Sequence, residues 1–189
     1  MEKVLLINAC VRPESRTMAL TRHVLEKIGG AVEEVNLERE AICPLNLSLL
    51  QEREQALEAG DMNAPILRYA RQFIEADTIV LAAPYWDLSF PAMVKAYFEA
   101  VTVCGVSFYY SEEGIPRGLC RAHRLIYVMT AGGPVMEPDW GFGYVAALAR
   151  NFYGIQDVKC FKAENLDVIG TDVEAVLART REEIDACDF

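Results

Sequence analysis

The chain has 189 residues, with 28 acidic and 18 basic side chains, so its formal net charge is −10. This acidic balance argues against nucleic acid or an anionic membrane as the main partner, because both bind basic surfaces. Hydrophobic residues make up 52% of the chain, which excludes wholesale disorder, and no apolar stretch reaches the length of a membrane span. The first ten residues lack the pattern of a signal peptide. We expect one cytoplasmic domain over residues 1–189.

The cysteines and histidines form no pattern of a disulfide framework or a metal site. The six cysteines are scattered without a C-x-x-C pair, and the two histidines, His23 and His123, lie far apart in the sequence. Structural zinc sites use closely spaced pairs, and disulfide frameworks belong to small secreted domains. We expect packed cytosolic thiols and no metal.

Short apolar runs alternate along the chain with amphipathic segments of helical spacing. In chain order the sequence predicts a strand at 4–7, a helix over 18–28, a strand at 31–36, a helix within 43–63 between Pro44 and Gly60, a strand at 77–83, a helix from Pro91 to Val101, a strand at 124–130, a helix over 144–152 that ends at Gly154, a strand at 158–162 and a helix over 173–184.

Local signals support several of these boundaries. Gly29 and Gly30 follow the first helix, as glycine commonly does past a last helical turn. Thr171 with Glu174 three residues later has the form of a capping box for the last helix. Five predicted strands interleaved with helices indicate parallel pairing, and near-continuous apolar strands fit a sheet covered on both faces. Together they predict a three-layer α/β domain.

In an open parallel sheet, ligands bind beyond the carboxyl ends of the strands. The loop after the first strand contains no glycine, so it is neither a Walker loop nor a dinucleotide fingerprint. It offers the hydroxyls of Ser15 and Thr17, with Arg12 and Arg16 on either side of Ser15. Together with the free N–H groups of a helix start, these suit a phosphate. The alternative is that Ser15 only caps the helix.

The loop after the third strand is aromatic and apolar, with the sequence Pro84-Tyr85-Trp86-Asp87-Leu88. Such a loop at a strand's carboxyl end can bury a flat ring system. Asp87 among these residues needs hydrogen-bond donors, either from nearby N–H groups or from a ligand. The alternative is an aromatic cluster that belongs to the core.

The loop after the fourth strand, Thr130-Ala131-Gly132-Gly133, lets the backbone approach a ligand edge because glycine has no Cβ. An ordinary strand-to-helix turn is the alternative. A phosphate cradle, a ring wall and a glycine edge at one end of a sheet favour a mononucleotide with a planar head, and flavin mononucleotide (FMN) fits this set better than a dinucleotide.

With these segments, the chain resembles the FMN-dependent NADH:quinone oxidoreductase and azoreductase family of the flavodoxin-like fold. The resemblance runs from Val4 to about Ile184 and rests on five segments in order: residues 8–17, 83–88, 105–114, 130–133 and 154–159. It implies the strand order 2-1-3-4-5 and a phosphate loop with hydroxyls at Ser15 and Thr17. Cys10 stands where the family commonly has serine.

The resemblance implies a ping-pong reaction in which hydride passes from NADH or NADPH through bound FMN to a quinone, azo or nitroaromatic acceptor. It also implies a homodimer, and it needs no catalytic side chain. One alternative is a flavodoxin-like electron carrier that binds FMN without turning over NAD(P)H. A phosphorylation-receiver domain fits poorly because it needs carboxylates at the ends of its first and third strands, and this chain has none there. A hydrolase that uses Ser15 or Cys10 with His23 has no supporting motif.

Overall fold

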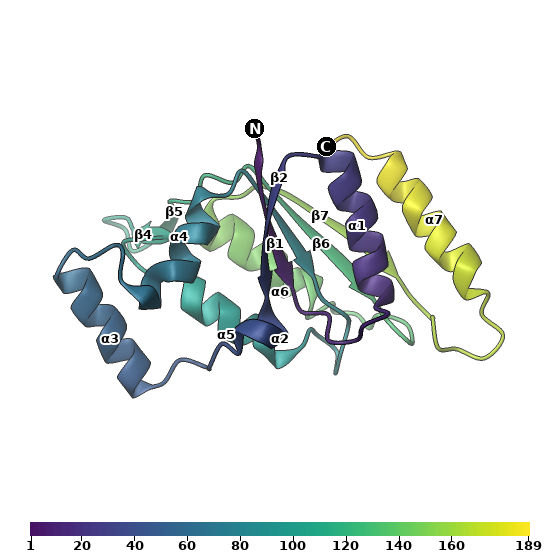
Figure 1. Cartoon of the computed structure of the whole chain (residues 1–189), viewed down its shortest axis with the longest axis horizontal. Coiled ribbons are helices and arrows are strands. Elements are labelled where there is room, and N and C mark those ends of the chain that lie inside the picture. Colours follow the sequence, from purple (N-terminus) through teal and green to yellow (C-terminus); the bar gives the residue numbers. More distant parts are fainter.

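The computed structural model describes residues 1–189 and has a central parallel sheet with helices on both faces (Figure 1). The strands are β1 (Lys3–Asn8), β2 (Ala31–Asn36), β3 (Thr78–Ala82), β4 (Phe108–Tyr110), β5 (Pro116–Gly118), β6 (Arg124–Thr130) and β7 (Asp157–Ala163). The helices are α1 (Arg16–Ile28), α2 (Leu37–Glu40), α3 (Leu47–Glu58), the 3-10 turn η1 (Pro65–Leu67), α4 (Arg68–Glu75), α5 (Ala92–Val101), α6 (Phe142–Leu148), the π-helical turn η2 (Ala149–Tyr153) and α7 (Val173–Asp185).

The main sheet has the order β2-β1-β3-β6-β7, and all of its strands are parallel. In terms of the five predicted strands this is the order 2-1-3-4-5, so the expected fold is confirmed. The crossovers are helical, as parallel pairing requires. No helix combines the length and the apolar character needed to cross a bilayer.

Alternate residues of each central strand face opposite layers, which divides the core in two. Leu5 and Ile7 of β1 pack in the layer that contains α4, α5 and α6, whereas Val4 and Leu6 pack against α1 and α7. Figure 1 shows α1 and α7 side by side over one face of the sheet. Both faces of the sheet are therefore covered, which explains why its central strands are almost uniformly apolar.

The structure corrects or extends several local predictions. The last helix is capped by Asp172, whose carboxylate accepts from the N–H of Ala175, so the predicted capping box at Thr171 is wrong. Pro91 occupies the N-cap position of α5 rather than its first turn. The helix predicted over 144–152 changes to π-helical geometry at Ala149 and ends, as expected, at Gly154 with φ 78°.

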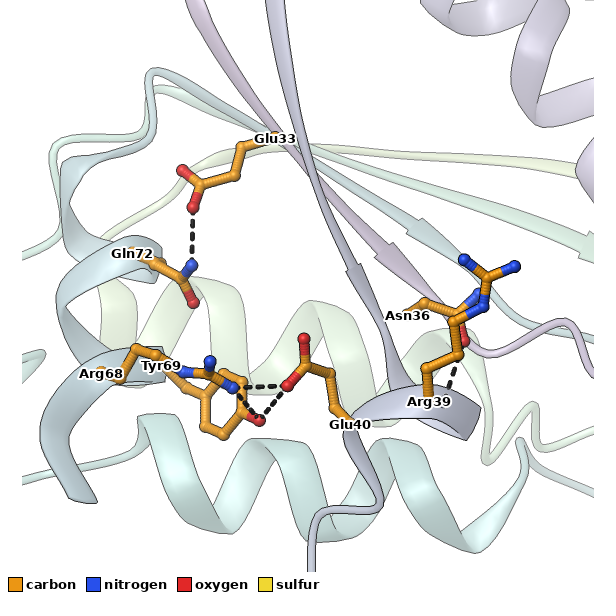
Figure 2. Close-up of polar contacts among 7 residues, drawn as sticks. All are labelled: Glu33, Asn36, Arg39, Glu40, Arg68, Tyr69 and Gln72. Atoms are coloured by element: carbon orange, nitrogen blue, oxygen red, sulfur yellow. Dashed lines mark hydrogen bonds and ion pairs between the residues drawn. The ribbon is translucent and has the colours of Figure 1, made fainter. Parts of the chain in front are cut away.

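A short antiparallel hairpin, β4–β5, and the helices α2 and α4 are additions that we did not predict. Glu40 at the end of α2 accepts from the Tyr69 hydroxyl of α4 at 2.8 Å and pairs with Arg68 (Figure 2). These contacts fix the short helix after β2 against the helix that precedes β3.

The buried tyrosines of α5 and η2 give a matched pair for a stability test. The hydroxyls of Tyr153 and Thr102 lie 2.6 Å apart, whereas the buried hydroxyl of Tyr97 has no hydrogen-bond partner. Tyr153→Phe should therefore lower the free energy of unfolding by about 1–2 kcal/mol, because Thr102 loses its partner. Tyr97→Phe removes an unsatisfied polar group and should be neutral or stabilising. Denaturant unfolding of both variants checks this, and equal losses would contradict the hydrogen-bond assignment.

Candidate functional site

The turns after β1, β3 and β6 meet at the carboxyl edge of the sheet and enclose a pocket there. The pocket has a volume of about 180 Å³ and is open to solvent. It is lined by Cys10, Val11, Arg12, Glu14, Ser15, Arg16, Thr17, Pro84, Tyr85, Trp86, Thr130, Ala131, Gly132 and Asp167. The three loops singled out in the sequence therefore form one site.

One end of the pocket is the start of helix α1. Ser15 is its N-cap, and the Ser15 Oγ accepts from the N–H of Met18 at 3.2 Å. The N–H groups of Arg16 and Thr17, the first two helical residues, donate to no acceptor in the chain. Free N–H groups at the positive end of a helix bind anions. The capping role and a ligand role of Ser15 are compatible, because its hydroxyl proton stays available for donation.

The two arginines that flank Ser15 have different surroundings. The Arg16 guanidinium lies 2.7 Å from the carboxylate of Asp167 and donates to the Leu166 carbonyl at 3.0 Å. Arg16 therefore links the loop after β1 to the loop after β7. Arg12 forms no ion pair or hydrogen bond through its side chain and is exposed at the pocket wall. Arg12 is thus the guanidinium that is free to meet an anion.

Thr17 and Cys10 line the inner wall of the same end. The Thr17 and Thr130 hydroxyls lie 2.6 Å apart and are buried, so they join the first loop to the end of β6. Cys10 Sγ lies 3.7 Å from the Ala82 carbonyl. Burial raises the pKa of the Cys10 thiol, so at neutral pH this side chain stays a neutral, weak donor.

The opposite wall is built by Pro84, Tyr85 and Trp86. The N–H of Tyr85 donates to the Thr130 carbonyl at 2.9 Å, which holds this loop beside the end of β6. The Trp86 side chain is 40% exposed at the mouth of the pocket. This wall presents aromatic surface with access from solvent, which is what stacking on a flat ligand requires.

Asp87 and Leu88 form the tip of a tight turn in which Trp86 and Ser89 exchange two backbone hydrogen bonds. Both tip residues have positive φ, 50° and 68°, as in the hairpin turns that usually take Asn-Gly. Both are exposed and neither lines the pocket. The Asp87 carboxylate thus has solvent around it, and the buried environment expected from the sequence is not present.

The glycine loop closes the third side. The carbonyls of Gly132 and Gly133 accept from the N–H groups of Asp167 and Asn165 at 2.8 and 3.0 Å. A Cβ at Gly132 would collide with the Asp167 side chain, whereas one at Gly133 would meet open space. Gly132 therefore permits the close approach of the loop after β7, and Gly133 lies outside the pocket.

All the residues nominated from the sequence line this pocket except Asp87, Leu88 and Gly133. Sequence reasoning missed Val11, Glu14 and Asp167. Asp167 follows β7, the fifth strand of the sheet, so the rule that pointed to three carboxyl-end loops could also have pointed to this one.

The sheet order and the pocket at its carboxyl edge are those of the flavodoxin-like fold. The model of the flavodoxin-like fold family matches residues 2–187. Among solved structures, azoreductase from Bacillus anthracis str. Sterne superposes with a TM-score of 0.84 at 24% identity, covering 97% of both chains. FMN-dependent NADH-azoreductase from Bacillus anthracis str. Ames Ancestor, in complex with FMN, gives 0.82 at 22% identity, covering 98% of this chain and 96% of that one. These likenesses show the fold.

Sequence relatives narrow the assignment. FMN-dependent NADH:quinone oxidoreductase from Lachnoclostridium phytofermentans is 35% identical over 192 residues, which is 97% of this chain and 96% of that protein. FMN-dependent NADH:quinone oxidoreductase 2 from Clostridium acetobutylicum is 36% identical, with the same shares covered. The chain belongs to the family of FMN-dependent NADH:quinone oxidoreductases within the flavodoxin-like fold, as the resemblance of its loops indicated.

Proposed function

We propose that this chain is an FMN-dependent oxidoreductase that takes electrons from NADH and reduces quinone and azo compounds, with FMN held in the pocket between the three turns. The observation that carries the proposal is the arrangement of that pocket. Free N–H groups at the start of α1 and the unpaired Arg12 lie at one end of the pocket. The aromatic side chains of Tyr85 and Trp86 form the opposite wall. These groups match a molecule with a phosphate and a flat ring.

The residues present fit FMN by their donor chemistry. The N–H groups of Arg16 and Thr17, the Ser15 hydroxyl and the Arg12 guanidinium would hold the phosphate. Tyr85 and Trp86 would cover the ring on one side, and the glycine loop would approach its edge. When bound, FMN supplies the two-electron redox chemistry.

The protein's own contribution is positioning. The Thr17–Thr130 hydroxyl pair and the Tyr85–Thr130 backbone hydrogen bond fix the three loops relative to one another, so the walls of the pocket are pre-organised. Trp86, partly exposed at the mouth of the pocket, would cover one face of the flavin ring and leave the other face to the electron donor or acceptor. No nucleophile is needed, and the protonated Cys10 thiol is not one.

The test of this function is reduction and turnover with the purified protein and FMN. Anaerobic NADH should bleach the flavin absorbance, and NADH should be consumed continuously when a water-soluble quinone or an azo dye is added. A flavodoxin-like electron carrier would bind FMN but show neither response. FMN binding without reduction by NADH or NADPH would therefore favour the carrier and contradict the proposal.

The Asp167 carboxylate gives a prediction about cofactor affinity. It lines the pocket and holds Arg16 by an ion pair at 2.7 Å. Asp167→Asn removes a negative charge from the pocket and weakens the hold on Arg16, so FMN should bind about five- to tenfold more tightly, an effect on the order of 1 kcal/mol. Fluorescence titration with FMN measures this. Weaker binding in the variant would mean that the ion pair is needed to shape the pocket.

We also propose a homodimer, reduction of nitroaromatic acceptors and a cytoplasmic location, as predicted from the sequence. Large exposed apolar side chains on the loops after β3 and β6 support the dimer: Trp86, Leu88, Met136 and Trp140 are 40%, 51%, 53% and 60% exposed. Exposed apolar groups of this kind commonly mark interfaces. Light scattering tests the dimer by comparing the molar mass of the unaltered protein in solution with that of Trp140→Ser. A monomer in the unaltered protein would contradict it.

A further inference from the structure

A second groove adjoins the FMN pocket on the side of strand β2. It is the larger of the two, with a volume of about 580 Å³, and it shares Cys10, Val11 and Arg12 with the pocket. Its other walls come from α1, from β1 and β2, and from α2, which follows β2 directly. The groove therefore begins where the phosphate site of the pocket ends.

Three arginines line this groove: Arg12, Arg22 and Arg39. None of their guanidinium groups forms an ion pair or a hydrogen bond within the chain, and all three residues are exposed. Figure 2 shows the Arg39 side chain pointing away from its neighbour Glu40, which is engaged with Arg68 and Tyr69. In a chain of net charge −10, unpaired arginines concentrated in one groove favour a ligand with more than one negative charge.

The remaining lining suits the other parts of a nucleotide. Glu38 lies in α2, two residues past the end of β2, and has no partner in the chain, whereas Glu34 accepts from the Asn8 amide at 2.8 Å. An acidic residue just past the second strand can accept hydrogen bonds from ribose hydroxyls. Apolar side chains of α1 and β2, Met18, Leu25 and Val32, complete the wall and provide surface for a base.

We propose that this groove binds the adenosine diphosphate group that FAD and NADH have in common. Arg22 and Arg39 would contact the phosphates, Glu38 the ribose and the apolar wall the adenine. The proposal rests on the proposed function, because it places this group next to the phosphate end of the flavin site. A nucleic acid does not fit as well, because its backbone would extend beyond the groove over a protein of net charge −10.

The experiment compares Arg22→Gln and Arg39→Gln with the unaltered protein and with Arg179→Gln. Arg179 is an exposed arginine of α7 outside the groove, so the control makes the same charge change at a distance. Calorimetry measures ADP binding, and flavin fluorescence measures the dissociation constants of FMN and FAD. FMN affinity serves as the internal check that each variant is folded with its pocket intact.

We expect ADP to bind the unaltered protein and the Arg179→Gln control. Each groove variant should weaken ADP binding about tenfold or more, with FMN affinity unchanged. If FAD affinity falls in parallel, the adenosine diphosphate group belongs to the flavin. If FAD affinity is unchanged and the KM for NADH rises about tenfold, it belongs to the electron donor.

ADP that fails to bind, or binds equally well to the groove variants and the control, would overturn the inference. Groove variants that weaken ADP binding but change neither FAD affinity nor the KM for NADH would also overturn it. These outcomes are separate from the proposed function. An unaltered protein that does not bind FMN would contradict the proposed function, whatever the ADP result.

Discussion

Replacing Ser15 with aspartate is expected to abolish tight FMN binding while leaving the fold intact. Aspartate is as good an N-cap as serine, so the hydrogen bond to the N–H of Met18 can be kept. A negative charge at the first turn also suits the helix dipole. The stability of the protein without cofactor should therefore be unchanged or slightly higher in Ser15→Asp.

FMN affinity, in contrast, should fall in Ser15→Asp. The new carboxylate would lie beside the phosphate of FMN, in the same part of the pocket as the free N–H groups of Arg16 and Thr17. Two unit charges about 4 Å apart repel by roughly 4 kcal/mol near a protein surface. Even half of this repulsion weakens binding by more than about tenfold, and we expect a loss of about 100-fold or more.

Ser15→Asn is the matched control for this charge. Asparagine also caps helices but carries no charge, so it should lose only a small part of the FMN affinity. Fluorescence titration of both variants measures the difference, and thermal unfolding without FMN verifies the cap. Equal FMN affinities of Ser15→Asp and Ser15→Asn would show that the phosphate does not lie at the start of α1.

A second large effect is expected at Gly118, at the end of the β4–β5 hairpin. A Cβ there would lie closer than 3.0 Å to the backbone of Tyr153 and Gly154. That backbone cannot move easily, because the Tyr153 ring is buried against Phe73 and Phe98 and its hydroxyl contacts Thr102. Gly118→Ala should therefore cost about 3 kcal/mol, at the upper end of typical overpacking losses.

Gly143→Ala provides the comparison. Gly143 lies within α6, and a Cβ there would meet no atom within 4 Å. Because alanine favours helix over glycine, this variant should be more stable by up to about 1 kcal/mol. Denaturant unfolding of both variants tests the pair. A Gly118→Ala variant within about 1 kcal/mol of the unaltered protein would mean that the hairpin does not pack tightly on η2.

Much of the sheet could be predicted because its central strands, β1, β3 and β6, are apolar runs between breakers. Residues 77–83, for example, are stopped by Pro84, and the observed β3 is Thr78–Ala82. The β4–β5 hairpin could not be predicted in this way, since each of its strands has only three residues. The cap of α7 was misplaced because Thr171 and Asp172 are adjacent acceptors, and only the backbone geometry selects Asp172.

The position of the pocket followed from topology, but the role of each side chain did not. Strand ends of a parallel sheet meet at one edge, so the loops after β1, β3 and β6 had to lie near one another. Arg16 and Asp167, however, are 151 residues apart, and no local pattern predicts their ion pair. For the same reason, the sequence could not show that Arg12 is free while Arg16 is engaged.

Titration of the cofactor-free protein with FMN tests most directly whether the three turns form a flavin pocket. Thermal unfolding should shift upward with FMN concentration, by about 2.7 kcal/mol of apparent stability when FMN is present at 100 times its dissociation constant. Flavin fluorescence should change over the same concentration range. A melting temperature that stays constant up to millimolar FMN would contradict the account.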